Sequence, residues 1–326
     1  MKLFYFILFS LIIHGCMSTS TSYPKAKRGD VADTFFEQTV HDPYRWMEDL
    51  DDPELKTWMI RQNEYTQTHL KDITGKQKYK NDLERFLNYK RVGMPRIRGE
   101  NQFYFKNDGL QDQYVLYKKK GDSEEVLLDP NMMNAEGTVS IDFISLDESG
   151  KYMAYGISNA GSDWTDIYVM NTETGEKLED KLTWVKFSGA NWHPDGTGFY
   201  YSRLPEVSEE NKFEAENKNS KLYFHKIGND QSMDQLIYED PDNPDYSFWA
   251  HATEDHQYLI LGVWNGTSKN NLMYVRPINS SEPFKPLVSD WIADMRFLGN
   301  DGNLFYFITD LDAPKNRLVA IYINQP

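Results

Sequence analysis

The sequence predicts a mainly β fold built from repeated sheets, and two observations support this. A turn followed by an aromatic strand recurs five times, and the interval between copies is that of one four-stranded blade of a β-propeller. The copies begin at Asn101, Gly150, Gly196, His256 and Gly302, which lie 49, 46, 60 and 46 residues apart. Only 24 residues follow Gly302. We therefore expect a partial propeller of about four and a half blades.

Turn residues separate the predicted strands. Asp147–Gly150, Asp195–Gly196 and Asn300–Gly302 supply Asp, Asn and Gly, which accept the positive φ angles of tight turns. Each copy then continues with a second strand and a strand–turn–strand unit. A blade is the simplest explanation of this order.

The longest interval between copies contains a polar stretch, residues 205–220. It is rich in Glu, Asn, Lys and Ser and has almost nothing apolar to bury. Such a composition is typical of a solvated loop. We expect an insertion within one blade.

Composition places the chain among β-rich globular proteins. Of its 326 residues, 40% are hydrophobic and 14% aromatic. The net charge of −15 disfavours nucleic-acid binding, because no basic stripe is present to displace phosphate counterions. Cys16 is the only cysteine, which excludes an intramolecular disulfide and a cysteine-based metal site.

Residues 1–22 are predicted to be an export signal and a tether. Lys2 precedes an apolar run, Leu3–Ile13, that is too short to span a bilayer of about 30 Å but suits a signal-peptide core. The sequence Ile13–Cys16 resembles a bacterial lipoprotein signal, in which the cysteine carries the lipid, although His14 departs from the usual small or apolar residue. The alternative is ordinary secretion. We expect a periplasmic or lipid-anchored bacterial protein.

In residues 23–92 the apolar residues recur at helical spacing, and not at every second position as in the predicted strands. Asp52 can cap a helix that has Pro53 at its first position and continues to about residue 71. A second helix is expected after Thr74, with Gln77 completing a capping box. Two amphipathic helices of this size cannot bury their apolar faces against each other alone, so we expect them to pack on a domain that is not propeller.

Several motifs occur in one order and together resemble the prolyl oligopeptidase family of serine peptidases. The N-terminal motif is Asp42–Asp49 (DPYRWMED), followed by the two helices. Later motifs are Gly109–Tyr117 (GLQDQYVLY), Leu128–Asn131 (LDPN), Tyr155–Trp164 (YGISNAGSDW), Val185–Ser188 (VKFS) and Lys221–His225 (KLYFH). The resemblance covers residue 23 to the end.

The resemblance implies a seven-bladed propeller that covers the active site of an α/β-hydrolase domain. Residues 93–326 would form an incomplete part of that propeller. Residues 23–92 would belong to that hydrolase domain. Serine peptidase chemistry needs a nucleophile on a sharp strand-to-helix turn, but no Gly-x-Ser-x-Gly motif occurs in the sequence. We therefore assign no catalytic residue to this chain. The histidines form no pair at metal-ligand spacing, so we assign no metal, and we expect no cofactor.

Two residues match family positions that face the substrate. Asp163 matches an acidic residue at the boundary of propeller and hydrolase, and Phe187 matches an aromatic residue that reaches the substrate cavity. The alternatives are a turn-capping carboxylate for Asp163 and an ordinary blade-core aromatic for Phe187. Trp46 is expected to anchor the N-terminal segment, and His193 and His256, beside blade turns, to have surface or hydrogen-bonding roles.

The sequence therefore predicts the N-terminal part of an exported prolyl oligopeptidase-like enzyme that cleaves short peptides after proline. Its propeller would admit peptides by size, and its catalytic triad would come from a C-terminal hydrolase domain. This chain alone should be inactive. The alternative is a noncatalytic propeller that binds a peptide or protein partner.

Overall fold

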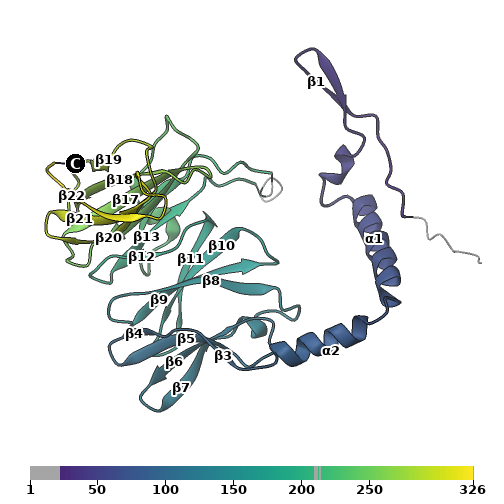
Figure 1. Cartoon of the computed structure of the whole chain (residues 1–326), viewed down its shortest axis with the longest axis horizontal. Coiled ribbons are helices and arrows are strands. Elements are labelled where there is room, and N and C mark those ends of the chain that lie inside the picture. The colour runs from purple at the N-terminus through teal and green to yellow at the C-terminus, as the bar shows by residue number, and fades with distance from the viewer. Residues whose placement is uncertain (1–22, 209–211, 213, 326) are drawn as a thin grey trace, which may run out of the picture. The chain divides into compact units, whose positions relative to one another are not determined.

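A computed structural model describes residues 23–208, 212 and 214–325 (Figure 1). The chain forms two compact units, Met1–Phe86 and Leu87–Pro326. The division predicted from the sequence, into residues 1–22, 23–92 and 93–326, is not tested by these two units and stays a prediction. Cys16 and the predicted export signal lie outside the described residues.

The N-terminal unit contains a hairpin and two helices. Its elements are β1 (Ala32–Phe35), β2 (Gln38–His41), the 3-10 helix η1 (Arg45–Met47), α1 (Pro53–Lys71) and α2 (Lys76–Leu87), whose last residue lies past the unit boundary. The predicted start of α1 is confirmed, because the carboxylate of Asp52 accepts a hydrogen bond of 2.6 Å from the N–H of Glu54. The guanidinium of Arg45 pairs with Asp33 and Asp42 and so joins the hairpin to η1.

The capping box predicted for α2 is wrong. Gln77 Nε2 donates to Asn81 Oδ1 at 2.7 Å, one turn further along the helix, instead of reaching back toward Thr74. The first turn is closed by the backbone, since the N–H of Tyr79 donates to the carbonyl of Gly75. The apolar stripe of this helix is uncovered, with Tyr79 69% and Leu83 59% exposed.

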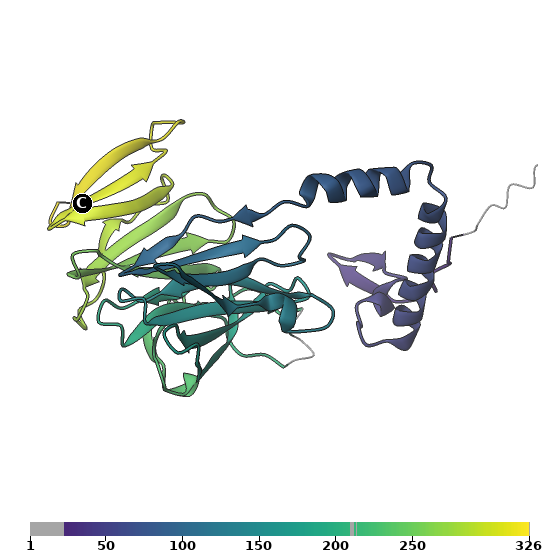
Figure 2. The same ribbon diagram turned by 90° about the horizontal axis from the view of Figure 1, so that it is seen from below.

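The second unit consists of five antiparallel sheets that follow one another along the chain (Figure 2). The first contains β3 (Arg91–Val92), β4 (Arg96–Arg98), β5 (Asn101–Asn107), β6 (Val115–Lys120) and β7 (Ser123–Leu128). The second contains β8 (Val139–Leu146), β9 (Tyr152–Asn159), β10 (Trp164–Asn171) and β11 (Lys177–Lys186). The third contains β12 (Asn191–Trp192), β13 (Gly198–Arg203), β14 (Lys221–Lys226) and β15 (Gln235–Tyr238). The fourth contains β16 (Tyr246–Ala252), β17 (Tyr258–Asn265), β18 (Asn271–Pro277) and β19 (Lys285–Val288). The fifth contains β20 (Met295–Asp301), β21 (Leu304–Thr309) and β22 (Arg317–Tyr322).

The mainly β propeller fold is confirmed. The five predicted aromatic strands become β5, β9, β13, β17 and β21, which are central strands of the five sheets. The first strands of three successive sheets, β8, β12 and β16, are neighbours. No sheet is closed among the described residues, and two short 3-10 helices, η2 (Pro130–Met132) and η4 (Gln231–Met233), lie in connections between strands.

The central strands of the second, third and fourth sheets have both faces buried, because each of these sheets packs between two others. In β17, Leu259 and Leu261 pack toward the third sheet and Ile260 packs toward the fifth. All three are fully buried. Opposite faces of one strand thus enter different hydrophobic cores, which explains why the aromatic and aliphatic runs lack polar alternation.

The fifth sheet has one covered face. Phe305 and Phe307 of β21 are fully buried against the fourth sheet, while Leu318 and Tyr322 of the edge strand β22 are 63% and 57% exposed. This agrees with the predicted partial propeller, whose last sheet has three strands among the described residues.

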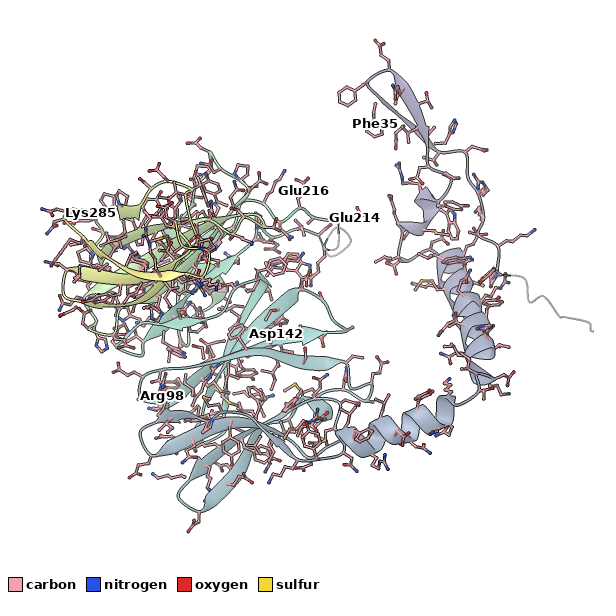
Figure 3. All side chains as sticks on the ribbon, in the orientation of Figure 1. Phe35, Arg98, Asp142, Glu214, Glu216 and Lys285 are labelled. Atoms are coloured by element: carbon pink, nitrogen blue, oxygen red, sulfur yellow. The ribbon has the colours of Figure 1, made fainter. Side chains whose placement is uncertain are left out.

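The polar insertion lies between β13 and β14 of the third sheet, as predicted. Its residues Glu214 and Glu216 are labelled in Figure 3, and Glu216 pairs with Lys218 at 2.8 Å. Over the described part of the chain, no helix is long and apolar enough to cross a membrane.

Candidate functional site

The ends of β10 and β11 bring the two predicted site residues to one place. In this antiparallel pair Trp164 lies opposite Lys186, and Thr165 lies opposite Val185. Continuing this register by one residue places Asp163 opposite Phe187, just beyond the ladder. Both residues therefore stand at the same end of the second sheet.

The insertion of the third sheet is bound to this end. The rings of Trp164 and Trp184 meet edge to face, with centroids 5.5 Å apart, and Lys186 Nζ lies 4.3 Å from the Trp164 ring centroid. Trp164 Nε1 donates to the backbone carbonyl of Lys212 at 3.0 Å. Lys186 Nζ donates to Asn217 Oδ1, also at 3.0 Å. Aromatic and cationic groups of β10 and β11 thus hold a polar loop in place.

The ring of Phe187 faces outward. Phe187 has a φ of +54°, which is unusual for a residue with a bulky side chain, and it is 76% exposed. The next residue, Ser188, fixes the turn because its Oγ accepts a hydrogen bond of 2.8 Å from the N–H of Ser202. The blade-core alternative for Phe187 is therefore wrong. An exposed aromatic in a strained turn suits a binding role.

Phe187 and Lys186 line a cavity of about 730 Å³ in the propeller unit. This volume lies within the range of small-ligand pockets. Most of the wall is apolar or aromatic and comes from the third, fourth and fifth sheets. Its bulky members are Phe187, Phe248, Trp249, Trp264, Met273, Met295 and Phe297, and its cations are Lys186 and Arg296.

Gly262 makes room for the indole rings of this wall. It lies opposite Trp249 in the pairing of β16 with β17. A Cβ on Gly262 would lie 2.6 Å from the ring of Trp264 and 3.3 Å from that of Trp249. The two rings meet edge to face over the glycine, with centroids 6.4 Å apart. The local signal for this wall is Gly262 two residues before Trp264, on the same face of one strand.

Asp163 is exposed and does not line this cavity. Within the described residues its carboxylate has no hydrogen bond or ion pair. The turn is capped instead by Ser162, whose Oγ accepts from the N–H of Trp164 at 3.1 Å. The turn-capping alternative for Asp163 is therefore wrong, and its carboxylate is free to meet a cation.

Histidines near the blade turns make hydrogen bonds or ion pairs, as predicted. His193 Nδ1 lies 2.8 Å from Asp195 Oδ1, and His256 Nε2 lies 3.2 Å from Glu148 Oε2. The described residues contain no group of three or more His, Cys, Asp or Glu side chains placed to hold a metal ion. The described lining of the Phe187 cavity includes no histidine, so its walls supply no Ser-His-Asp triad.

Sequence reasoning missed His225, which is fully buried between two carboxylates. Its Nε2 lies 2.8 Å from Asp180 Oδ1, and its Nδ1 lies 2.7 Å from Asp234 Oδ1. Burial opposes the charged imidazolium, but the hydrogen bonds and charges of Asp180 and Asp234 outweigh it and raise the pKa of His225 to about 9. No local motif signals this cluster, because Asp180 precedes His225 by 45 residues.

Known proteins resemble the chain over nearly its whole length. A prolyl endopeptidase from Elizabethkingia meningoseptica is 36% identical over 310 residues, which are 95% of this chain and 44% of that protein. Prolyl oligopeptidase A from Amanita bisporigera is 31% identical, over 97% of this chain and 46% of that protein. The chain thus spans about half the length of these relatives.

Solved structures of prolyl oligopeptidases also resemble this chain. Prolyl oligopeptidase B from Galerina marginata, bound to a 25mer macrocyclization substrate, superposes with a TM-score of 0.82 at 29% identity, over 93% of this chain and 46% of that one. Residues 23–326 match the family described as prolyl oligopeptidase, N-terminal beta-propeller domain. The chain therefore belongs to the prolyl oligopeptidase family and carries its N-terminal β-propeller domain.

Proposed function

We propose that this chain is the propeller-bearing part of a serine endopeptidase that cleaves short peptides after proline. Family membership and the names of the relatives support the reaction class. The single structural observation that carries the proposal is the exposed ring of Phe187 on an aromatic cavity. An aromatic wall suits the flat, apolar pyrrolidine ring of proline.

Phe187 and Asp163 have different roles in this proposal. Phe187 packs against the apolar part of the peptide. Asp163, whose carboxylate has no partner within the described residues, pairs with a basic group of the hydrolase domain or with the amine of a substrate. The propeller limits access to peptides short enough to enter.

The catalytic triad belongs to a C-terminal α/β-hydrolase domain. The sequence contains no Gly-x-Ser-x-Gly elbow, and the relatives are about twice as long as the matched region. In this proposal the hydrolase domain covers the exposed stripe of α2, which includes Tyr79 and Leu83.

A turnover assay tests the assignment of the chemistry. The purified chain is offered a chromogenic Gly-Pro peptide, with and without a serine-directed inhibitor. We expect no inhibitor-sensitive turnover. Turnover that the inhibitor abolishes would show that the chain holds its own nucleophile and would refute the proposal.

A noncatalytic binding module is the second candidate. One observation favours it: the sequence contains no Gly-x-Ser-x-Gly elbow that would supply a nucleophile. The coding sequence beyond codon 326 separates the two candidates. A continuing frame with a Gly-x-Ser-x-Gly elbow supports the enzyme, whereas an immediate stop codon and a soluble monomeric product support the module.

We also propose export and lipid attachment at Cys16, on the basis of Lys2, the apolar run Leu3–Ile13 and the lipoprotein-like Ile13–Cys16. Expression in a bacterium with labelled palmitate tests this. We expect label in the wild-type protein and none in Cys16→Ala. Equal labelling of both proteins contradicts lipid attachment at this cysteine, and an unlabelled secreted wild type supports ordinary secretion.

A further inference from the structure

A second cavity, of about 610 Å³, lies where the third and fourth sheets meet. It shares no lining residue with the Phe187 cavity. Its walls come from the β12–β13 turn, β13, β14, β15, the end of β18 and the turn that follows β18. The volume falls within the range of small-molecule sites.

Among the described residues, Arg276 is the one arginine or lysine on the wall of this cavity. Its guanidinium carbon lies 4.4 Å from the centroid of the Phe284 ring, so one face of the group is covered. Its Nε is buried without a hydrogen-bond partner, and within the described residues the guanidinium has no ion pair or hydrogen bond. Burial lowers the pKa of Arg276, although the nearby Tyr200 opposes this effect.

An unpaired, half-buried guanidinium is costly, because lost hydration is not replaced by fixed acceptors. The chain has 50 acidic and 35 basic residues, yet within the described part of the chain no carboxylate pairs with this one. Arg91 and Arg98 also have a buried Nε without a partner, but each donates through another guanidinium nitrogen. Arg276 is left with donors and no acceptor.

Tyr200 supplies a second donor. It is 4% exposed, and its hydroxyl makes no hydrogen bond within the described residues. Burial raises the pKa of Tyr200 to about 12, so the hydroxyl keeps its proton at neutral pH. Tyr200 belongs to the third sheet and Arg276 to the fourth, so a ligand that both contact would bridge the two sheets.

Asp195, the one acidic residue among the described residues of the wall, already accepts hydrogen bonds. Its Oδ1 accepts from the N–H of Thr197 at 2.9 Å and from the Thr197 hydroxyl at 2.7 Å, and it pairs with His193. These donors offset the negative charge that Asp195 presents to the cavity. A single guanidinium then matches a monoanion better than a phosphate dianion.

The rest of the wall is mixed, with polar side chains such as Gln235 and Asn279 beside an apolar part. Phe224, Leu236, Ile237 and Ile278 give it an apolar side. A planar carboxylate fits the fork of an arginine, and an apolar body fits these side chains. We infer that this cavity binds a small organic carboxylate, with Arg276 and Tyr200 donating to the carboxylate and the apolar side chains covering its body.

Benzoate is the probe, with benzamide as its uncharged counterpart and inorganic phosphate as the competing anion. Binding to the purified chain is measured by calorimetry at constant ionic strength. We expect benzoate to bind at least about tenfold more tightly than benzamide or phosphate, because one charge-assisted pair contributes this much. Phosphate binding as tight as benzoate binding, or no benzoate binding at millimolar concentration, would overturn the inference.

Variants locate the site. Arg276→Gln should weaken benzoate about 10- to 100-fold, and Tyr200→Phe about 2- to 10-fold. Arg203→Gln is the matched control, since Arg203 also lies over an aromatic ring, that of Tyr223 at 4.7 Å, but outside this cavity. It should leave the affinity unchanged. Circular dichroism checks that each variant is folded. If Arg276→Gln and Tyr200→Phe both bind benzoate as tightly as wild type, the proposed site is contradicted. It is also contradicted if Arg203→Gln weakens benzoate binding as much as Arg276→Gln does.

Discussion

His225 Nε2 lies 2.8 Å from Asp180 Oδ1, and this contact joins β14 of the third sheet to β11, the edge strand of the second. Asp180 Oδ1 also accepts from the N–H of Gly228 at 2.6 Å, and Asp234 accepts from the hydroxyl of Tyr201 at 2.6 Å. Removing the imidazole would leave two buried carboxylates without their cation, which is strongly destabilising.

Stability should depend on pH through this cluster. The pKa of His225 is raised to about 9, so its contribution is complete below the unfolded value of about 6.5 and is lost as the pH rises through about 9. The pKa of Asp180 is lowered: burial acts against the charged form, but the hydrogen bonds from His225 and Gly228 outweigh it. Its contribution is present above about 3.9 and is lost as the pH falls.

Urea unfolding of the wild type and of His225→Gln measures this dependence. The difference in unfolding free energy between the two proteins should be largest between about pH 5 and 6.5 and should shrink from pH 7 to 9. A difference that stays constant, or grows, toward pH 9 would mean that His225 is neutral in the folded protein.

Removal of the imidazole should be strongly destabilising. His225→Phe leaves Asp180 and Asp234 buried without their cation, and breaking a buried pair in this way costs about 3–5 kcal/mol. Tyr201→Phe is the matched change, since it removes one hydrogen bond to Asp234 and should cost about 1–3 kcal/mol. Chemical denaturation compares the two. Similar losses would contradict a charged cluster.

Gly262→Ala should disturb the wall of the Phe187 cavity. The added methyl group would overlap the ring of Trp264, and overpacking of this kind costs about 1–3 kcal/mol. Near-ultraviolet circular dichroism should show an altered tryptophan environment. Gly299→Ala is the control, because nothing lies within 4 Å of a Cβ at that glycine. Equal stability of the two variants would show that Trp264 moves aside at no cost.

Lys186→Met should loosen the insertion between β13 and β14. It keeps the length of the side chain but removes the charge over Trp164 and the hydrogen bond to Asn217. A cation–π contact contributes about 0.5–2 kcal/mol. Limited proteolysis should cut the loop faster than in wild type, whereas Lys177→Met, an exposed change on the same strand, should have no effect. Unchanged cleavage in Lys186→Met would show that these contacts do not hold the loop.

The blade pattern could be predicted from the sequence because it is local. A turn and an aromatic strand repeat at a fixed interval, and each copy forms a central strand such as β9 or β17. The start of α1 was also predictable, since Asp52 and Pro53 are adjacent. The capping box at Thr74 was not, because Gln77 found an acceptor on its own helix at Asn81.

The candidate site was only partly predictable. Inner blade strands are buried on both faces, so their sequences lack the alternation of apolar and polar residues that would show which way a side chain points. The sequence therefore could not show whether Phe187 faced a core or a cavity. Its positive φ and exposure decided this. His225 and Arg276 depend on contacts between sheets, with residues that are distant in sequence. No pattern within one strand signals them.

Binding of a short proline-containing peptide to the purified chain, measured by calorimetry, tests the central claim most directly. We expect binding that Phe187→Ala weakens about tenfold, equivalent to about 1.4 kcal/mol. Phe36→Ala should have no effect, since Phe36 is also an exposed phenylalanine but is not among the residues that line the cavity. Peptide affinity that is the same in wild type and Phe187→Ala would contradict a substrate-facing role for this cavity.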